Sequence, residues 1–162
     1  MKYFLFIILF SLSFSELIKP ENNAFLNYIH IYFEWDQEPD AIGYNLQVSN
    51  QQSFNNLILN IEETSTAYIA KNNFNWNSNY FWRVRPINVD SNYGNWIDTS
   101  YFQIGNSILP NLDVYIYNDD LIQDGLNMYS QFSPYFAVGV IDKNGNEIWN
   151  TQQVYMNHIN DF

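Results

Sequence analysis

Short runs that alternate apolar and polar residues dominate this 162-residue chain from Glu16 onward, and no helical period extends beyond a few residues. The clearest run is 29–36, in which Ile31, Phe33 and Trp35 fall on one side and His30 falls on the other. Because successive side chains of a β-strand point to opposite faces, this period of two predicts a half-buried strand. Clusters of Asn, Asp, Gly and Pro separate the runs, so the sequence predicts an all-β fold.

The other clear runs share this alternation and lie at 43–49, 54–61, 66–70, 80–86 and 99–104. In the run 43–49 we expect Tyr44, Leu46 and Val48 to face a core. We expect the polar residues between them to be solvated, namely Asn45, Gln47 and Ser49. We expect seven short strands, these six clear runs and one more, in the roughly 90 residues up to Gly105, which is the size of a seven-stranded immunoglobulin-like sandwich.

Four spaced motifs between residues 18 and 104 sharpen this expectation. They are Trp35 in Phe33-Glu34-Trp35-Asp36, Gly43-Tyr44-x-Leu46-x-Val48, Tyr80-x-Trp82-Arg83-Val84-Arg85, and Gly94-x-Trp96 before a Tyr-Phe strand. Together they resemble a fibronectin type III domain of the bacterial surface variety. The resemblance implies that Trp35 fills the centre of the sandwich and that the Tyr80 hydroxyl bonds back across its corner. The chain has no cysteine, which argues against a true immunoglobulin domain with its inter-sheet disulfide.

A different pattern begins after Gly105. Residues 106–111 predict a linker, 112–117 a strand and 118–125 an acidic loop. Residues 135–142 are expected to pair with 147–150 across a Lys143-Asn144-Gly145-Asn146 turn, because Asn-Gly between alternating runs favours a tight hairpin. Three strands are too few to close a core of their own.

This tail carries a second resemblance. Its motifs are Val114-Tyr115-Ile116-Tyr117-Asn118-Asp119-Asp120, Gln123-Asp124-Gly125-Leu126 and Val140-Ile141-Asp142-x-x-Gly145-x-Glu147-Ile148-Trp149. They resemble the opening of an arylsulfotransferase-like β-propeller. The resemblance implies that residues 112–162 are an incomplete first blade and that the chain is an N-terminal fragment. The parent protein would transfer sulfate from aryl sulfates to phenolic acceptors with residues of later blades. Quinoprotein-like propellers share such hairpins and remain an alternative.

The N-terminus predicts export. Lys2 supplies a positive charge, an apolar run follows at 3–10, and Ser13 and Ser15 are the small residues that a signal peptidase requires. We expect cleavage of the signal peptide 1–15 between Ser15 and Glu16, which places the mature protein outside the cytoplasm, secreted, periplasmic or on the cell surface. The apolar run is too short to span a bilayer, so we expect no membrane insertion after cleavage.

Composition excludes several classes of function. Seventeen Asp and Glu against six Lys and Arg give a net charge of −11, so nucleic acid and anionic lipid would be repelled. The absence of cysteine excludes a disulfide framework, a Cys-ligated metal site, a thiol nucleophile and a Cys lipid anchor.

The sequence assigns no catalytic residue, cofactor or metal site. His158 lies in no family motif, and His30 belongs to the polar side of its strand. Asp119, Asp120 and Asp124 are interpreted as an acidic surface loop rather than a cation site. The 142–147 turn lacks the spacing of a calcium-binding EF-hand loop. We therefore expect no sulfotransferase activity from the 162-residue chain alone.

Four aromatic residues offer a further possibility for binding. Trp76, Phe81, Tyr93 and Trp96 would bind sugar rings by stacking if they formed an exposed strip, and otherwise they pack loops or a following domain. Two functions stay open. The chain is either a module that positions its own C-terminal propeller, or a free-standing secreted adhesion or glycan-binding protein whose partner is a carbohydrate or another surface protein.

Overall fold

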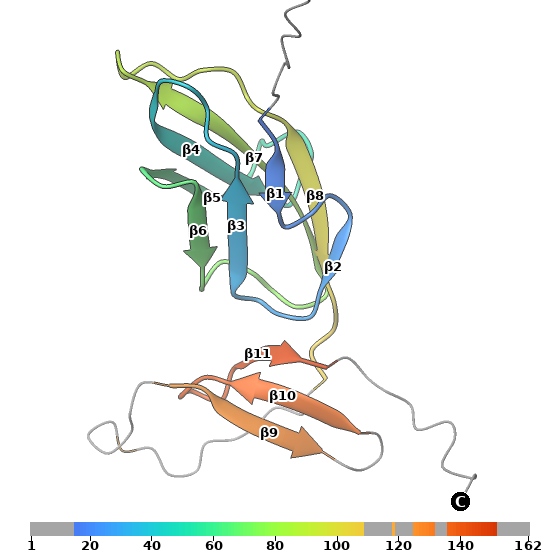
Figure 1. The fold of residues 1–162 in the computed structure, drawn as a ribbon. Helices are drawn as coiled ribbons and strands as arrows, with labels where there is room; N and C mark the ends of the chain where they lie inside the picture. Colours follow the sequence, from blue (N-terminus) through green and yellow to red (C-terminus); the bar gives the residue numbers. More distant parts are fainter. Residues whose placement is uncertain (1–14, 109–117, 119–124, 132–135, 152–162) are drawn as a thin grey trace, which may run out of the picture.

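The structure is a computed structural model that describes residues 15–108, 118, 125–131 and 136–151 (Figure 1). Its regular structure within these ranges consists of eleven strands in three sheets, with no helix, which confirms the all-β expectation. The segment 1–14, the expected strand 112–117 and His158 lie outside the described residues.

Two of the three sheets face each other as a sandwich. One sheet has the order β1-β3-β6, and the other has the order β2-β8-β7-β4-β5. The strands of the first are β1 (Leu17–Lys19), β3 (Ile31–Trp35) and β6 (Ala67–Ala70). Those of the second are β2 (Ala24–Leu26), β8 (Thr99–Ile104), β7 (Ser78–Asn88), β4 (Ala41–Ser49) and β5 (Leu57–Glu63). Every pair is antiparallel except the parallel pair β2 and β8. β1 and β2 were not expected.

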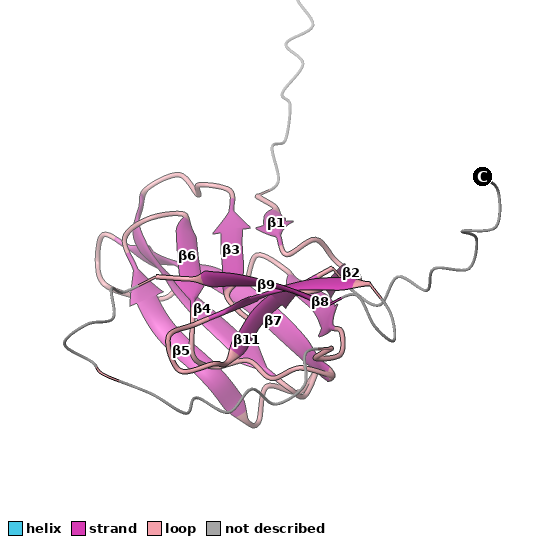
Figure 2. Cartoon of the chain, turned by 90° about the horizontal axis from the view of Figure 1, so that it is seen from below, coloured by secondary structure: helices cyan, strands magenta, loops and turns pink. Residues whose placement is uncertain are grey.

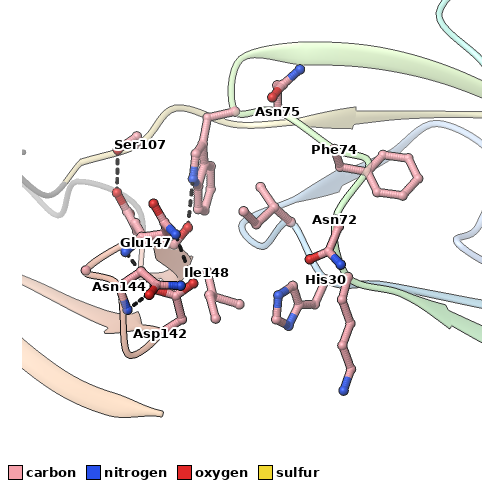
Figure 3. Close-up of a pocket in the computed structure, with 14 residues that line it drawn as sticks. His30, Asn72, Phe74, Asn75, Ser107, Asp142, Asn144, Glu147 and Ile148 are labelled. Atoms are coloured by element: carbon pink, nitrogen blue, oxygen red, sulfur yellow. Dashed lines mark hydrogen bonds between the residues drawn. The ribbon is translucent and has the colours of Figure 1, made fainter. Parts of the chain in front are cut away.

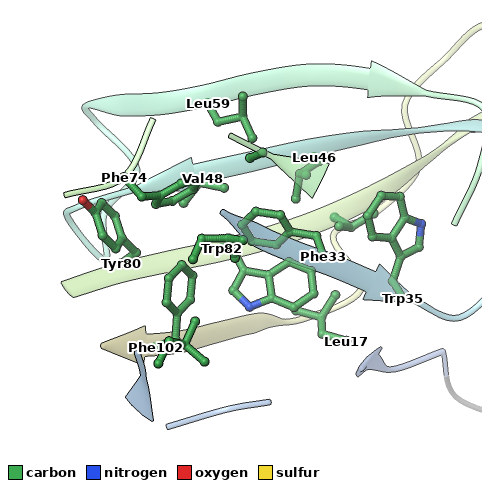
Figure 4. Packing of buried hydrophobic residues seen from close by; sticks show 14 of the residues in the cluster. Leu17, Phe33, Trp35, Leu46, Val48, Leu59, Phe74, Tyr80, Trp82 and Phe102 are labelled. Atoms are coloured by element: carbon green, nitrogen blue, oxygen red, sulfur yellow. The ribbon is translucent and has the colours of Figure 1, made fainter. Parts of the chain in front are cut away.

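Aromatic rings fill the space between these sheets (Figure 4). Phe33 of β3 packs against Trp82 of β7 at 5.2 Å, Phe102 of β8 at 6.1 Å and Phe74 at 6.0 Å between ring centroids. Trp35 is also fully buried, but its one ring contact among the described residues is with Tyr44, at 5.6 Å. The ring contacts therefore centre on Phe33, Phe74 and Phe102, each with three ring partners, rather than on Trp35.

The expectation that the Tyr80 hydroxyl forms a hydrogen bond across its corner is confirmed. The backbone N–H of Asn75 donates to the Tyr80 hydroxyl at 2.9 Å, which ties the segment before β7 to the strand itself. Tyr80 is buried, and its ring packs edge-on against Phe74 at 4.9 Å. A buried tyrosine with a satisfied hydroxyl fixes this corner of the sandwich.

The expectation of a solvated face on β4 was wrong. Asn45, Gln47 and Ser49 point away from the apolar core, yet all three are buried. The reason is that β4 lies between β7 and β5, and arginine side chains of β7 cover the amides of Asn45 and Gln47. The Ser49 hydroxyl donates to the backbone carbonyl of Asn56 at 2.7 Å, so it too is satisfied.

The third sheet, which we call the tail sheet, lies beneath one end of the sandwich and crosses that end when seen from below (Figures 1 and 2). It contains β11 (Glu147–Asn150), β10 (Ala137–Ile141) and β9 (Asn127–Gln131) in that order, all antiparallel. The expected hairpin between β10 and β11 is confirmed. Gly145 has φ 83° in its turn, a conformation that glycine adopts without strain. β9 was not expected.

Candidate functional site

A short backbone segment of the sandwich pairs with β11 and extends the tail sheet by one strand. The N–H of Ile29 donates to the carbonyl of Ile148 at 2.9 Å, and the N–H of Asn150 donates to the carbonyl of Asn27 at 2.9 Å. Tyr28 forms an antiparallel bridge with Trp149 between these two bonds. Residues 27–29 thus act as a short additional strand beside β11. We call this region, together with Trp76 and residues 106–108, the junction.

A buried carboxylate lies at the centre of the junction. Glu147 accepts hydrogen bonds from the Ser107 hydroxyl, the backbone N–H of Ile108 at 3.2 Å and the side-chain amide of Asn150. Its own backbone carbonyl accepts the indole N–H of Trp76 at 3.1 Å. Three of the residues expected as a linker, 106–108, are therefore hydrogen-bonded to the tail sheet, since the amide of Asn150 also donates to the Asn106 carbonyl at 3.0 Å.

A polar groove of about 480 Å³ opens beside this network (Figure 3). His30, Lys71, Asn72 and Asn75 line it from the sandwich, and the turn 142–146 lines it from the tail sheet. Clefts between two packed units are common places for small molecules to bind. The lining supplies amide, imidazole, ammonium and carboxylate groups, which suit a polar ligand better than an apolar one.

Two titratable groups that line the groove, Asp142 and His30, have shifted pKa values. Burial raises the pKa of Asp142, but hydrogen bonds from Asn146 and Asn144 outweigh this effect and hold the pKa below its usual range. Burial, followed by the charge of Lys71, lowers the pKa of His30, while Asp142 opposes the shift. The Asp142 carboxylate is thus committed to shaping its own turn, with N–H donors at 2.8 and 2.9 Å.

A second polar feature covers the outer face of the five-stranded sheet. The guanidinium of Arg83 lies over the rings of Phe54 at 4.0 Å and Trp96 at 3.9 Å. The guanidinium of Arg85 lies over the rings of Trp96 at 4.3 Å and Tyr93 at 3.8 Å. These five side chains alternate between ring and cation, and we call them the arginine ladder. Each such contact is worth about 0.5 to 2 kcal/mol, depending on exposure.

Neutral amides support the ladder from beneath. Nε and Nη2 of Arg83 donate to Oε1 of Gln47 at 3.1 and 2.8 Å, and Nε of Arg85 donates to Oδ1 of Asn45 at 3.1 Å. Asn60 joins both amides, because its Oδ1 accepts from Asn45 at 2.9 Å and from Gln47 at 3.2 Å. This network explains why polar residues of β4 are buried without an unsatisfied group.

The four aromatic residues that the sequence grouped as one candidate strip lie in two different places. Tyr93 and Trp96 belong to the ladder, and Phe81 lies on the same face of β7, paired with Tyr101 at 5.1 Å. Trp76 lies in the junction. Because two guanidinium groups contact the Trp96 ring, that ring is not an open platform for a sugar. The ladder was not expected, although the Arg-x-Arg spacing on the outer side of an aromatic strand is a sequence signal for it.

The expected cleavage site and the remaining sequence candidates are placed as follows. Ser15 is half-buried and Glu16 is exposed. The backbone of Glu16 exchanges hydrogen bonds with Asp36 at 3.0 and 3.1 Å, so the sandwich begins at this residue. His30 is half-buried and lines the groove. Asp119, Asp120, Asp124 and His158 lie outside the described residues.

No protein-family model matches the chain, and no curated protein matches it. Within the described ranges, no three His, Asp or Glu side chains gather closely enough to hold a metal ion. No helix in these ranges is long and apolar enough to cross a membrane.

Proposed function

We propose that this chain is the exported, non-catalytic fibronectin type III-like module and first-blade opening of an arylsulfotransferase-like protein. In this proposal the sandwich holds the tail sheet as the starting blade of a propeller, and later blades carry the chemistry. The observation that carries the proposal is the junction, where residues 27–29 pair with β11 and Glu147 joins both units. Such a contact fixes the orientation of the tail sheet, which is what a positioning module must do.

Two further features support the fibronectin-like part of the proposal. The split into a β1-β3-β6 sheet and a β8-β7-β4-β5 sheet with an added β2 is compatible with that family's topology. The hydrogen bond from Asn75 to the Tyr80 hydroxyl has the character of a tyrosine corner. Support for the propeller part is the β10–β11 hairpin formed by the Asp142-to-Trp149 motif.

The coding DNA beyond Phe162 tests this proposal. We expect an open frame that encodes repeated hairpins of the Asp-x-x-Gly-x-Glu-Ile-Trp type. A stop codon directly after Phe162 would instead favour the free-standing binding protein.

Activity gives a second test. A protein extended through the propeller should transfer sulfate from an aryl sulfate to a phenol, and the 162-residue chain should not. Turnover by the short chain that is lost in His158→Ala would overturn the assignment of a non-catalytic module. An inactive extended protein would argue against the sulfotransferase resemblance.

Export is tested separately by intact-mass analysis of secreted material. The secreted species should begin at Glu16. Retention of residues 1–15 would contradict the export proposal. The cut is compatible with the fold, because β1 begins one residue later, at Leu17.

A further inference from the structure

Both arginines of this chain lie together. Arg83 and Arg85 are its only arginines, and they occupy neighbouring outward positions of β7 in a molecule with a net charge of −11. Residues two apart on a strand point to the same face about 7 Å from each other. The outer face of the five-stranded sheet therefore carries a concentrated positive charge on an otherwise acidic protein.

Stacking and hydrogen bonds hold both guanidinium groups in fixed orientations. Rings lie against their faces at 3.8 to 4.3 Å, so each plane is held in place. Their edges toward the sheet bond to Gln47 and Asn45. Within the described part of the chain, Nη1 of Arg83 and both terminal nitrogens of Arg85 have no hydrogen-bond acceptor. A guanidinium that is stacked on its faces and bonded at one edge presents its other edge for recognition.

No carboxylate of the described residues forms an ion pair with Arg83 or Arg85. The one ion pair in these ranges is Lys19 with Glu21, at another part of the sandwich. The supports beneath the arginines are neutral amides, although the chain contains seventeen acidic residues. Glu62, at the end of the ladder, accepts the Tyr93 hydroxyl rather than pairing with Arg85. Burial, and then the nearby charge of Arg85, lowers the pKa of Arg83, as expected for adjacent cations without a counterion.

We propose that the arginine ladder binds the carboxylate of an acidic saccharide, such as a uronate residue. The planar donors of Arg83 and Arg85 match the geometry of a carboxylate. The net charge of −11 repels densely charged polyanions over long distances, whereas a short uronate carries one charge per sugar ring. Tyr93, the exposed end of the ladder, and the neighbouring Phe81–Tyr101 pair offer surfaces for the sugar's C–H face, because Tyr93 is 46% exposed and the pair is half-buried.

This site belongs to the sandwich alone. It therefore does not depend on the proposed propeller, and a stop codon after Phe162 would leave it unaffected. Conversely, loss of saccharide binding would leave the proposed positioning role unaffected.

Side-chain NMR of the chain tests the proposal directly. Two arginines give two Nε–H peaks, one for each rung of the ladder. Addition of trigalacturonate should shift both peaks in a saturable manner, and addition of its fully methyl-esterified form should not, because the ester keeps the sugar rings and removes the charge. Equal shifts with both sugars would show stacking without carboxylate recognition and would overturn the proposal. No shift at millimolar trigalacturonate would also overturn it.

Variants distinguish carboxylate recognition by the arginine ladder from the general effect of net charge on binding. Arg85→Gln should weaken binding by about tenfold or more, and Arg85→Lys should also weaken it because the planar fork is lost. Lys19→Gln removes the same charge elsewhere on the sandwich and should change the affinity less than about twofold. Glu62→Gln, which removes a negative charge at the end of the ladder, should strengthen binding.

Circular dichroism must show that each variant is folded, and the wild-type NMR titration decides the matter if Arg85→Gln is not. Equal losses in Arg85→Gln and Lys19→Gln would mean that net charge, rather than the ladder, governs binding.

Discussion

Inside the sandwich, the Phe33 ring is surrounded by three other aromatic rings, whereas at the junction the Glu147 carboxylate is surrounded by hydrogen-bond donors. Burial of rings is favourable in many relative orientations, since the hydrophobic effect has no direction. A carboxylate with several donors is favourable in few orientations, because each bond requires its own distance and angle. The sandwich interior thus provides stability, and the junction provides the orientation of the tail sheet.

Replacement of a buried aromatic ring should cause the largest loss of stability, in the sandwich and at the junction alike. Trp35→Ala should lower the free energy of unfolding by about 3 to 5 kcal/mol, the usual cost of truncating a buried aromatic side chain. Trp35→Phe is the matched control. Among the residues that the structure describes, the Trp35 Nε1 has no hydrogen-bond partner, so this change removes volume without breaking a bond. Urea unfolding of the whole chain measures both. A loss below about 1 kcal/mol for Trp35→Ala would place its ring outside the stabilising core.

Replacement of the Glu147 carboxylate should destabilise the junction and leave the sandwich interior unchanged. Glu147→Gln leaves an amide NH₂ facing donors, and we expect a loss of about 1 to 3 kcal/mol confined to the junction. Hydrogen exchange should accelerate at the amides of Ile29 and Asn150, which bond across the junction, and not at Trp35, whose amide bonds to Thr66 within the sandwich.

Glu21→Gln is the control for loss of a carboxylate, because Glu21 is exposed and belongs to a surface ion pair of small expected energy. Equal acceleration at the Ile29, Asn150 and Trp35 amides in Glu147→Gln would mean that the junction and the sandwich unfold as one unit.

Removal of a single hydrogen bond across the junction should cause a smaller loss of stability. Trp76→Phe keeps an aromatic ring but removes the N–H that donates to the Glu147 carbonyl, at an expected cost of about 0.5 to 1.5 kcal/mol. The same exchange experiment should show faster exchange at Asn150 and no change at Trp35. Unchanged exchange at Asn150 would mean that the backbone pairing of residues 27–29 holds the tail sheet without help from the indole.

The features that the sequence predicted correctly are local ones. The alternation at Ile31, Phe33 and Trp35 places all three in the core, and the turn at Gly145 closes the β10–β11 hairpin. Both depend on residues a few positions apart, where the period of two and the turn chemistry act directly. The three-residue strands β1 and β2 were missed because each exists through pairing with a partner strand rather than through its own pattern.

The features of the candidate sites depend on distant residues. Asn45 and Gln47 were expected in solvent, but Arg85 and Arg83 reach them from 40 and 36 positions away. The Trp76 indole finds its acceptor 71 positions away. Alternation gives the face on which a side chain lies, but it does not tell what covers that face. The fibronectin type III and arylsulfotransferase resemblances stay predictions.

The smallest expected effect is the dependence of stability on pH through His30, which lines the groove. The pKa of His30 should lie below its ordinary value of 6.5, because burial and Lys71 disfavour the imidazolium more than Asp142 favours it. A lowered pKa in the folded state means that the unfolded chain binds the proton more tightly. The contribution of His30 to stability is therefore complete above about pH 6.5 and decreases as the pH falls below that value.

NMR titration of the two histidines measures this shift, with His158→Ala to assign the signals. Lys71→Gln should raise the His30 pKa, and Asp142→Asn should lower it further, since each removes one of the two opposing charges. A His30 pKa above 6.5, or a decrease in Lys71→Gln, would mean that the charges of the groove do not act on His30 as its position implies.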